Sequence, residues 1–280
     1  MEYKMNLKPF VKWAGGKRQL LVHILELLPA NYNNYYEPFI GGGALFFHLK
    51  PKNASINDVN TDLLAIYKTL HDKSEFAKMI FLLDEHEKNH SEDYYYEVRD
   101  MDRKLGYHDL EDSEKAARLI YLNKSCFNGL YRVNSKGYFN VPFGKKDKVK
   151  TYDIENLRAI NEYFLNHKIK ISNLDFEDAV KGAKKGDFIY FDPPYDPVDE
   201  KDSFTAYSKN NFSREDQIRL ANLYKDLNQK GVFLMLSNHN TKLINELYKE
   251  FNINVVKATR MINSKSSGRG HIEEVIITNY

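Results

Sequence analysis

The feature that most constrains this chain is a run of strand-forming residues that stops at an acid and two prolines. Phe188 to Phe191 are aromatic or β-branched, which predicts a short buried strand. Asp192-Pro193-Pro194-Tyr195 follows, and because proline donates no N–H to a sheet ladder, the strand has to end at Asp192. We expect a carboxylate and carbonyl oxygens beside the Tyr195 ring, which suits a planar group that donates hydrogen bonds, such as the amine of a base. A strand-ending turn without chemistry is the alternative.

A second candidate binding element lies near the N-terminus. Tyr35 to Ile40 predicts a strand, which leads through Gly41-Gly42-Gly43 into a helix-like stretch. Such a turn lets the backbone approach a cofactor, but Phe46 replaces the third glycine of the dinucleotide fingerprint, which argues against NAD. Residues 54–58 predict a strand that ends at Asp58, where a ribose-binding carboxylate would stand. The pattern predicts a site for adenosine without a pyrophosphate, or a βαβ unit that binds no ligand.

A glycine turn precedes these elements. Gly15-Gly16-Lys17 invites comparison with a Walker-type phosphate loop, but the upstream glycine and the Ser or Thr after the lysine are absent. We therefore exclude nucleoside triphosphate binding. The turn can bring Lys17 and the only tryptophan, Trp13, close to a ligand. The alternative is a helix-entry turn with Trp13 in the core.

The rest of the chain divides into a helical part and an α/β part. Periodicity is helical from Thr61 to about Leu122, whereas strand and helix patterns alternate after Tyr152. We expect an α/β fold: a three-layer Rossmann-like sheet from residues 1–62 and 151–280, interrupted by a helical insert at 63–150. Residues 196–212 are a candidate lid, and Ser213 with Asp216 predicts a capping box.

Within the insert, residues 127–144 alternate like a β-hairpin around an Asn-Ser-Lys-Gly turn. Arg132 lies in its first arm and suits a bidentate grip on guanine, and Phe127 is a candidate wedge between bases. The formal net charge of +2 is too small to indicate a nucleic-acid partner. The charge is uneven, however, and the stretch 124–150 contains Lys124, Arg132, Lys136, Lys145, Lys146, Lys148 and Lys150 against Asp147. A phosphate-binding surface is one interpretation, and a solvated lysine-rich loop is the other.

Composition excludes several classes of protein. The single cysteine, Cys126, rules out an intramolecular disulfide framework and a cysteine-rich zinc site. No apolar run approaches membrane-spanning length, and the first residues lack the apolar core of a secretion signal. We therefore expect a cytoplasmic protein.

Four motifs occur together in a particular order. They are Lys12-Trp13-Ala14-Gly15-Gly16-Lys17, Phe39-x-Gly41-x-Gly43, Phe127-Asn128-Gly129-Leu130-Tyr131-Arg132 and Asp192-Pro193-Pro194-Tyr195. On these motifs the chain resembles the Dam family of DNA adenine-N6 methyltransferases, of the α group, over nearly its whole length. In that group the cofactor motif comes first, a target-recognition insert follows, and the catalytic motif comes last. The resemblance implies that the sheet domain binds S-adenosylmethionine and that residues 63–150 form the DNA-binding insert.

The resemblance also assigns roles position by position. The catalytic residues would be Asp192, Pro193, Pro194 and Tyr195. The cofactor would be held by Trp13, Lys17, Phe39, Gly41, Gly43, Asp58, Asp175, Phe176 and Asp192. DNA would be contacted by Lys12, Phe127, Asn128, Leu130, Arg132, Asn134 and Pro142, with Lys12 and Arg132 reading bases. Where the family often has Arg after the Val-Pro-Phe-Gly segment, this chain has Lys145 and Lys146, which affects one phosphate contact.

The implied reaction transfers a methyl group to N6 of an adenine that has left the duplex, most commonly within GATC. The adenine amine is a poor nucleophile because its lone pair is delocalised. Asp192 and the Pro193 carbonyl would accept its hydrogens, so that the lone pair turns toward the methyl group while Tyr195 stacks on the base. No metal is required. The expected partners are double-stranded DNA and, functionally, a cognate restriction endonuclease, and we expect a monomer that contacts no membrane.

Two other functions stay open. A methyltransferase acting on RNA or on a protein amide could use a related site, although the Asp at position 192 and the basic insert favour DNA. A catalytically silent DNA-binding protein would need neither Asp192 nor the glycine turn, and both are intact. A cytosine-C5 enzyme would need a nucleophilic cysteine after proline, which the sequence lacks.

Overall fold

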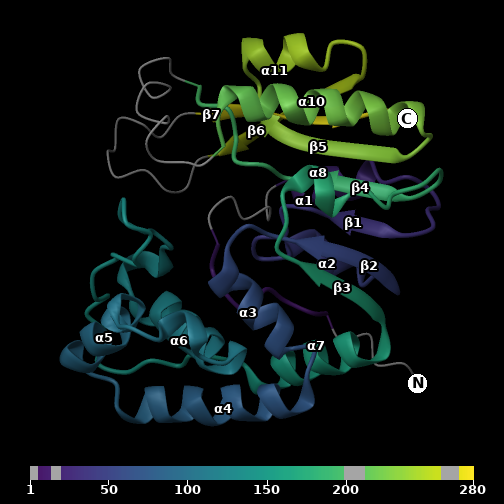
Figure 1. The fold of residues 1–280 in the computed structure, drawn as a ribbon. Helices are drawn as coiled ribbons and strands as arrows, with labels where there is room; N and C mark the ends of the chain where they lie inside the picture. The colour runs from purple at the N-terminus through teal and green to yellow at the C-terminus, as the bar shows by residue number, and fades with distance from the viewer. Residues whose placement is uncertain (1–5, 14–19, 199–211, 260–270) are drawn as a thin grey trace. The chain divides into compact units, whose positions relative to one another are not determined.

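In the described part of the chain, seven strands form one sheet in the order β3-β2-β1-β4-β5-β7-β6 (Figure 1). The structure, a computed structural model, describes residues 6–13, 20–198, 212–259 and 271–280. The strands are β1 (Tyr35–Glu37), β2 (Asn53–Asn57), β3 (Lys168–Ser172), β4 (Phe188–Phe191), β5 (Phe233–His239), β6 (Asn252–Thr259) and β7 (His271–Thr278). Strands β1, β2, β4 and β5 are parallel, while β7 runs antiparallel to β5 and β6. The mixed α/β class and the Rossmann-like sheet predicted from the sequence are confirmed.

Helices connect these strands and make up most of the segment between β2 and β3. They are α1 (Leu21–Glu26), α2 (Ala44–Leu49), α3 (Thr61–Thr69), α4 (Lys73–Lys88), α5 (Glu92–Arg99), α6 (Asp112–Ser125), α7 (Ile154–Asn166), α8 (Phe176–Ala179), α10 (Arg214–Gln229) and α11 (Lys242–Leu247), with the 3-10 helices η1 (Asp100–Arg103), η2 (Tyr107–Asp109) and η3 (Phe127–Gly129). The predicted capping box starts α10. There Ser213 Oγ accepts from the Asp216 N–H at 3.2 Å, and Asp216 Oδ2 accepts from the Ser213 N–H at 2.8 Å.

The chain separates into two compact units. One, the helical unit, comprises residues 1–16, 41–52 and 58–173, and the other, the sheet unit, comprises residues 17–40, 53–57 and 174–280. The functional division made from the sequence, with a DNA-binding part at 63–150, stays a prediction. In the described part of the chain, no helix is both long enough and apolar enough to span a membrane.

Helix α10 runs along the strands of the sheet unit (Figure 1), and its buried apolar residues belong to the core of that unit. Strand β4 sits between two parallel neighbours, so all four of its residues are buried. Ile189 packs with Leu220 of α10 and Leu234 of β5 in one apolar cluster. The strand stops where Asp192 and its prolines begin, as predicted.

Residues 127–144 of the helical unit fold back on themselves, but their pairing is irregular. The predicted turn is present, since the Gly137 N–H donates to the Asn134 carbonyl at 2.9 Å. The arms meet through two isolated bridges, Cys126 to Phe143 and Val133 to Phe139, instead of two regular strands. Asn128 interrupts the first arm with a φ of 56° inside η3, and Pro142 has no N–H to give to a ladder.

Candidate active site

The direction of the strand connections reverses between β1 and β4. From β1 the chain continues to β2 on one side, and from β4 it continues to β5 on the other. In open parallel sheets, ligands bind at the carboxyl ends of the strands at such a switch point. The segments that leave these two strands are Pro38–Ile40 and Asp192–Tyr195, so the sheet brings Phe39 and the Asp-Pro-Pro-Tyr motif to one edge of the sheet unit.

Two hydroxyl groups orient the Asp192 carboxylate. The Ser237 hydroxyl of β5 donates to Asp192 Oδ1 at 3.1 Å, and the Tyr190 hydroxyl of β4 lies 2.8 Å from Ser237 Oγ. Because Ser237 gives its single hydrogen to Asp192, Tyr190 donates to Ser237. Burial raises the pKa of Tyr190 well above its usual value, and the nearby Asp192 charge adds to the effect. Tyr190 therefore stays protonated and keeps its role as a donor.

Tyr195 is also fixed by its surroundings. Its ring meets the His239 ring edge-on, with centroids 4.9 Å apart, and its hydroxyl lies 3.4 Å from Glu274 Oε2. Burial raises the pKa of Tyr195 well above its usual value, with Asp192 as the second cause. The ring is therefore neutral and held beside Asp192.

The segment after β1 packs against an aromatic ring through Phe39. Phe39 packs against Phe176 at 5.6 Å between ring centroids, and the Arg219 guanidinium lies 4.8 Å from the Phe176 centroid. Asp175 caps α8 by accepting from the Glu177 N–H at 3.0 Å, and it pairs with Arg219 at 2.9 Å. Asp175 and Phe176 thus have structural contacts of their own, and their role toward a cofactor stays a prediction.

Asn57, which the sequence analysis missed, ties together the loops at this edge. Its amide donates to the carbonyls of Pro38 at 3.1 Å and Leu174 at 3.0 Å, and its Oδ1 accepts from the Leu174 N–H at 2.8 Å. The side chain is 2% exposed. The sequence signal that could have identified Asn57 is its position as the last residue of β2, because residues at the carboxyl ends of strands reach the neighbouring loops.

The helical unit brings three of the predicted cofactor residues together. Gly41 has a φ of +47°, and a Cβ placed there would lie 3.0 Å from Trp13 Cδ1. The Gly41 N–H donates to Asp58 Oδ2 at 3.0 Å, and the Tyr67 hydroxyl donates to the Gly41 carbonyl at 2.8 Å. Burial raises the pKa of Asp58, and N–H donors including Asn60 and Gly41 oppose this. Close contact and a left-handed backbone both require glycine at position 41.

Gly43 completes this turn. It caps α2 with a φ of +69°, and a Cβ there would lie 2.7 Å from the Tyr67 hydroxyl. Lys17, also predicted to line the cofactor site, lies outside the described residues, as do residues 199–211 of the predicted lid.

Lys12 is held by a side chain that sequence reasoning missed. Asn123 of α6 accepts from the Lys12 N–H and donates to the Lys12 carbonyl, both at 2.8 Å. The Lys12 ammonium donates to the Asn128 carbonyl at 2.7 Å. Lys12 and Asn128, two of the seven residues predicted to contact DNA, are therefore neighbours.

Arg132 is oriented by Asn140 across the irregular hairpin. Its Nε donates to Asn140 Oδ1 at 2.7 Å and its Nη2 to the Asn140 carbonyl at 3.0 Å, while the Asn140 N–H donates to the Arg132 carbonyl at 3.0 Å. Arg132 is exposed. The guanidinium is exposed and oriented by a neutral amide, so its remaining N–H groups can donate to two acceptors that lie in one plane.

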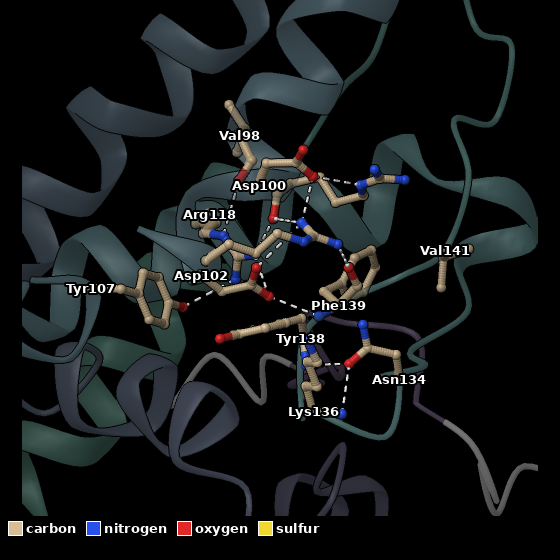
Figure 2. Close-up of polar contacts among 12 residues, drawn as sticks. Val98, Asp100, Asp102, Tyr107, Arg118, Asn134, Lys136, Tyr138, Phe139 and Val141 are labelled. Carbon is tan, nitrogen blue, oxygen red and sulfur yellow. Dashed lines mark hydrogen bonds and ion pairs between the residues drawn. The ribbon is translucent and has the colours of Figure 1, made fainter. Parts of the chain in front are cut away.

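The other residues predicted to contact DNA differ in their exposure. Phe127 is 52% exposed, and Pro142 is exposed as well. Leu130 packs on the cluster around buried Cys126. Asn134 makes the turn, since its Oδ1 accepts from the N–H groups of Lys136 at 2.9 Å and Tyr138 at 3.1 Å (Figure 2).

A buried ion pair anchors this loop (Figure 2). Arg118 of α6, whose side chain is 1% exposed, pairs with Asp102 of η1 at 2.9 Å. Asp102 Oδ2 also accepts from the Phe139 N–H at 2.7 Å, and Arg103 donates to the Phe139 carbonyl at 3.1 Å. Both polar groups of the Phe139 backbone are thus held, one residue before Asn140.

The sheet order and its switch point are those of a Rossmann-like methyltransferase. A family model for D12 class N6 adenine-specific DNA methyltransferases matches residues 13–262. The chain belongs to this family, and it is an adenine-specific DNA methyltransferase. The family depends on S-adenosylmethionine.

Similar proteins align over nearly the whole chain. The Type II methyltransferase M1.LlaDCHI of Lactococcus lactis subsp. cremoris is 51% identical over 277 residues, covering 99% of this chain and 97% of that protein. The Type II methyltransferase M.MjaIII of Methanocaldococcus jannaschii is 41% identical, covering 99% and 100%. A DNA adenine methylase of Haemophilus influenzae is 34% identical, covering 98% and 94%.

Proposed function

We propose that this enzyme transfers the methyl group of S-adenosylmethionine to N6 of an adenine flipped out of duplex DNA, within GATC. The observation that carries the proposal is the Asp192 carboxylate, held at the switch point by the Tyr190–Ser237 hydroxyl chain. A neutral donor orients a carboxylate without cancelling its charge, so Asp192 can still accept from an amine. GATC comes from the resemblance of the insert to the Dam family.

The residues around Asp192 supply alignment. Asp192 and the Pro193 carbonyl would accept the two amine hydrogens, and Tyr195 would stack on the base. S-adenosylmethionine would supply the methyl group, leaving as the thioether, and the amine nitrogen would lose one of its hydrogens as a proton. Alignment of this kind can lower a barrier by about 7–11 kcal/mol. Flipping the base would cost on the order of a few kcal/mol in lost stacking and pairing, and contacts between the base and the protein would offset that cost.

The glycine turn fits S-adenosylmethionine, which supplies the activated methyl group. Gly41 and Gly43 keep the backbone open to close approach, the Trp13 indole lies against the turn, and Asp58 is a carboxylate suited to ribose hydroxyls. In the sheet unit, Phe39 would lie beneath the cofactor, Asp175 and Phe176 would flank its adenine, and Asp192 would complete the set. Lys17 belongs to the same proposed set.

DNA recognition is proposed for the helical unit. Arg132 would hold a guanine, Lys12 would read a second base, and Phe127 would fill the space left by the flipped adenine. The surrounding contacts would come from Asn128, Leu130, Asn134 and Pro142. The Type II names of two relatives support a role beside a cognate restriction endonuclease.

The test uses labelled S-adenosylmethionine and a set of duplexes that differ from GATC by single bases. We expect incorporation into adenine of GATC, and Asp192→Ala should abolish it while leaving much of the DNA affinity, because phosphate contacts dominate that affinity. Asp226→Ala, at an exposed position of α10, is the control and should stay active. Incorporation into cytosine, equal incorporation into duplexes without the site, or an active Asp192→Ala variant would refute the proposal.

A further inference from the structure

Two buried carboxamides lie behind the Asp-Pro-Pro-Tyr loop of the sheet unit. Gln217 of α10 is 2% exposed and Asn238 of β5 is fully buried. Burying a carboxamide is costly unless its oxygen and nitrogen find partners. Each of these side chains forms hydrogen bonds with the other and with the loop. The pair therefore joins the core to the proposed catalytic segment.

The hydrogen bonds run in one direction. Asn238 Nδ2 donates to Gln217 Oε1 at 3.2 Å, and Gln217 Nε2 donates to the Pro194 carbonyl at 2.9 Å. Asn238 Oδ1 accepts from the Asp196 N–H at 2.9 Å. If the Gln217 amide were reversed, its oxygen would face the Pro194 carbonyl, and two acceptors would oppose each other. The order of donors and acceptors is therefore fixed.

The two bonds to the loop hold Tyr195 from both sides. The Pro194 carbonyl belongs to the peptide group before Tyr195, and the Asp196 N–H belongs to the peptide group after it. Holding both peptide groups fixes the two backbone dihedrals of Tyr195. Asp196 is anchored further, because its carboxylate accepts from the Thr241 hydroxyl at 2.6 Å and its carbonyl lies 2.7 Å from His239 Nδ1.

We propose that Gln217 and Asn238 are positioning residues for methyl transfer. They set the backbone of the loop so that Asp192, the Pro193 carbonyl and the Tyr195 ring meet the target amine together. This inference rests on the proposed function of the loop. Misplacement of reacting groups by about 1 Å can cost about 10²-fold in rate, so the loss should appear in the chemical step and leave binding nearly intact.

The test substitutes Gln217→Glu and follows single-turnover methylation across pH. The introduced carboxyl has nearly the shape of the amide and still accepts from Asn238. When ionised it opposes the Pro194 carbonyl, and when protonated it donates to that carbonyl. Burial raises the pKa of a carboxyl group, so the rate should recover at mildly acidic pH. The neighbouring titratable groups, Asp196, Arg214 and His239, remain in both enzymes, and the ratio of the two rates isolates the substitution.

At pH 8.5 and saturating DNA and cofactor, we expect the rate of the Gln217→Glu enzyme to be about 30-fold below that of the unsubstituted enzyme. The ratio should improve about 10-fold by pH 6, and the dissociation constants for S-adenosylmethionine and DNA should change by about threefold at most. Gln229→Glu, the same substitution at an exposed position of α10, should have no effect at either pH. If Gln217→Glu does not fold, Asn238→Asp removes the donor to Gln217 while keeping the acceptor for Asp196, and the same rates are measured.

The possible outcomes separate two failures. An unchanged rate, or a loss that is equal at both pH values and accompanied by weak cofactor binding, would overturn the positioning role. If that result occurs while Asp192→Ala is inactive, the proposed function stands and this inference alone fails. If Asp192→Ala is active, the proposed function itself is refuted.

Discussion

Removing the charge of Asp102 should destabilise the helical unit strongly. Asp102→Asn leaves the Arg118 guanidinium in the core with the closer of its two ion-pair partners neutralised. The Arg118 side chain is 1% exposed and that of Asp102 is 8% exposed, so water cannot replace the lost partner. The substituted amide still offers its oxygen to the Phe139 N–H, so the change keeps that hydrogen bond. It removes the charge that faces Arg118 and, at 3.5 Å, the partly exposed Arg103.

The magnitude follows from the remaining contacts of Arg118. Breaking a buried pair typically costs about 3–5 kcal/mol. Arg118 keeps the carbonyls of Val98 at 2.9 Å and Arg99 at 2.7 Å, and Asp62 lies 3.7 Å away. These contacts place the expected cost at the lower end, about 3 kcal/mol. Asp102→Ala also removes the acceptor of the buried Phe139 N–H, which adds about 1–3 kcal/mol.

The assay is urea unfolding followed by tryptophan fluorescence. Trp13, the only tryptophan, stacks on Tyr131 at 4.6 Å between ring centroids, so its emission reports on the helical unit. With a slope of about 2–3 kcal/mol per M, the midpoint of Asp102→Asn should fall by about 1 M or slightly more. The control is Asp100→Asn in the same 3-10 helix. Asp100 is 45% exposed and pairs with Arg99 and Arg103, and its loss should cost at most about 1 kcal/mol. Equal midpoints for the two variants would refute the argument.

Three further predictions follow from other contacts. Asn140→Ala should narrow the rate difference between the preferred duplex and one altered at the guanine that Arg132 is proposed to hold. Arg132→Ala should narrow that difference by a factor that corresponds to about 1–3 kcal/mol. The double variant should match Arg132→Ala in single-turnover rates, because both substitutions act through one guanidinium. Gly41→Ala should weaken S-adenosylmethionine binding measured by calorimetry, because its Cβ would meet Trp13 at 3.0 Å. Gly106 also has a positive φ but has open space around it, so Gly106→Ala should leave that binding unchanged. Burial lowers the pKa of His86 from 6.5 to about 4. Between about pH 6.5 and pH 4 the unfolded state binds this proton and the folded state does not, so the free energy of unfolding should fall as the pH drops through this range. His86→Phe should flatten that pH dependence in the same urea assay.

Local patterns predicted the elements that depend on neighbouring residues. The run from Phe188 gave β4 with an end at Asp192, and the Ser213 and Asp216 pair gave the start of α10. The hairpin was harder to predict. Alternation in residues 127–144 favoured two strands, but the left-handed Asn128 and the missing N–H of Pro142 leave isolated bridges.

The residues that sequence reasoning missed act across long separations. Asn123 holds Lys12 from 111 positions away, and Asp102 holds Phe139 from 37 positions away. Gln217, 23 positions from Pro194, follows a capping box and resembles part of a solvated helix start in the sequence. Spacing carries no information about such bonds, because a side chain that donates to a distant backbone group leaves no period in the sequence.

The missed residues near the proposed catalytic loop share one chemical property. Ser237, Gln217 and Asn238 are neutral, and they hold Asp192, Pro194 and Asp196 by hydrogen bonds. A cationic partner would orient a carboxylate more strongly. It would also compete with the amine hydrogens for the negative charge of that carboxylate. Neutral amides and hydroxyls fix position while leaving that charge in place. The same reasoning explains why Tyr190 suits its place in β4, since a phenol whose pKa is raised by burial donates its hydrogen bond without adding a charge of its own.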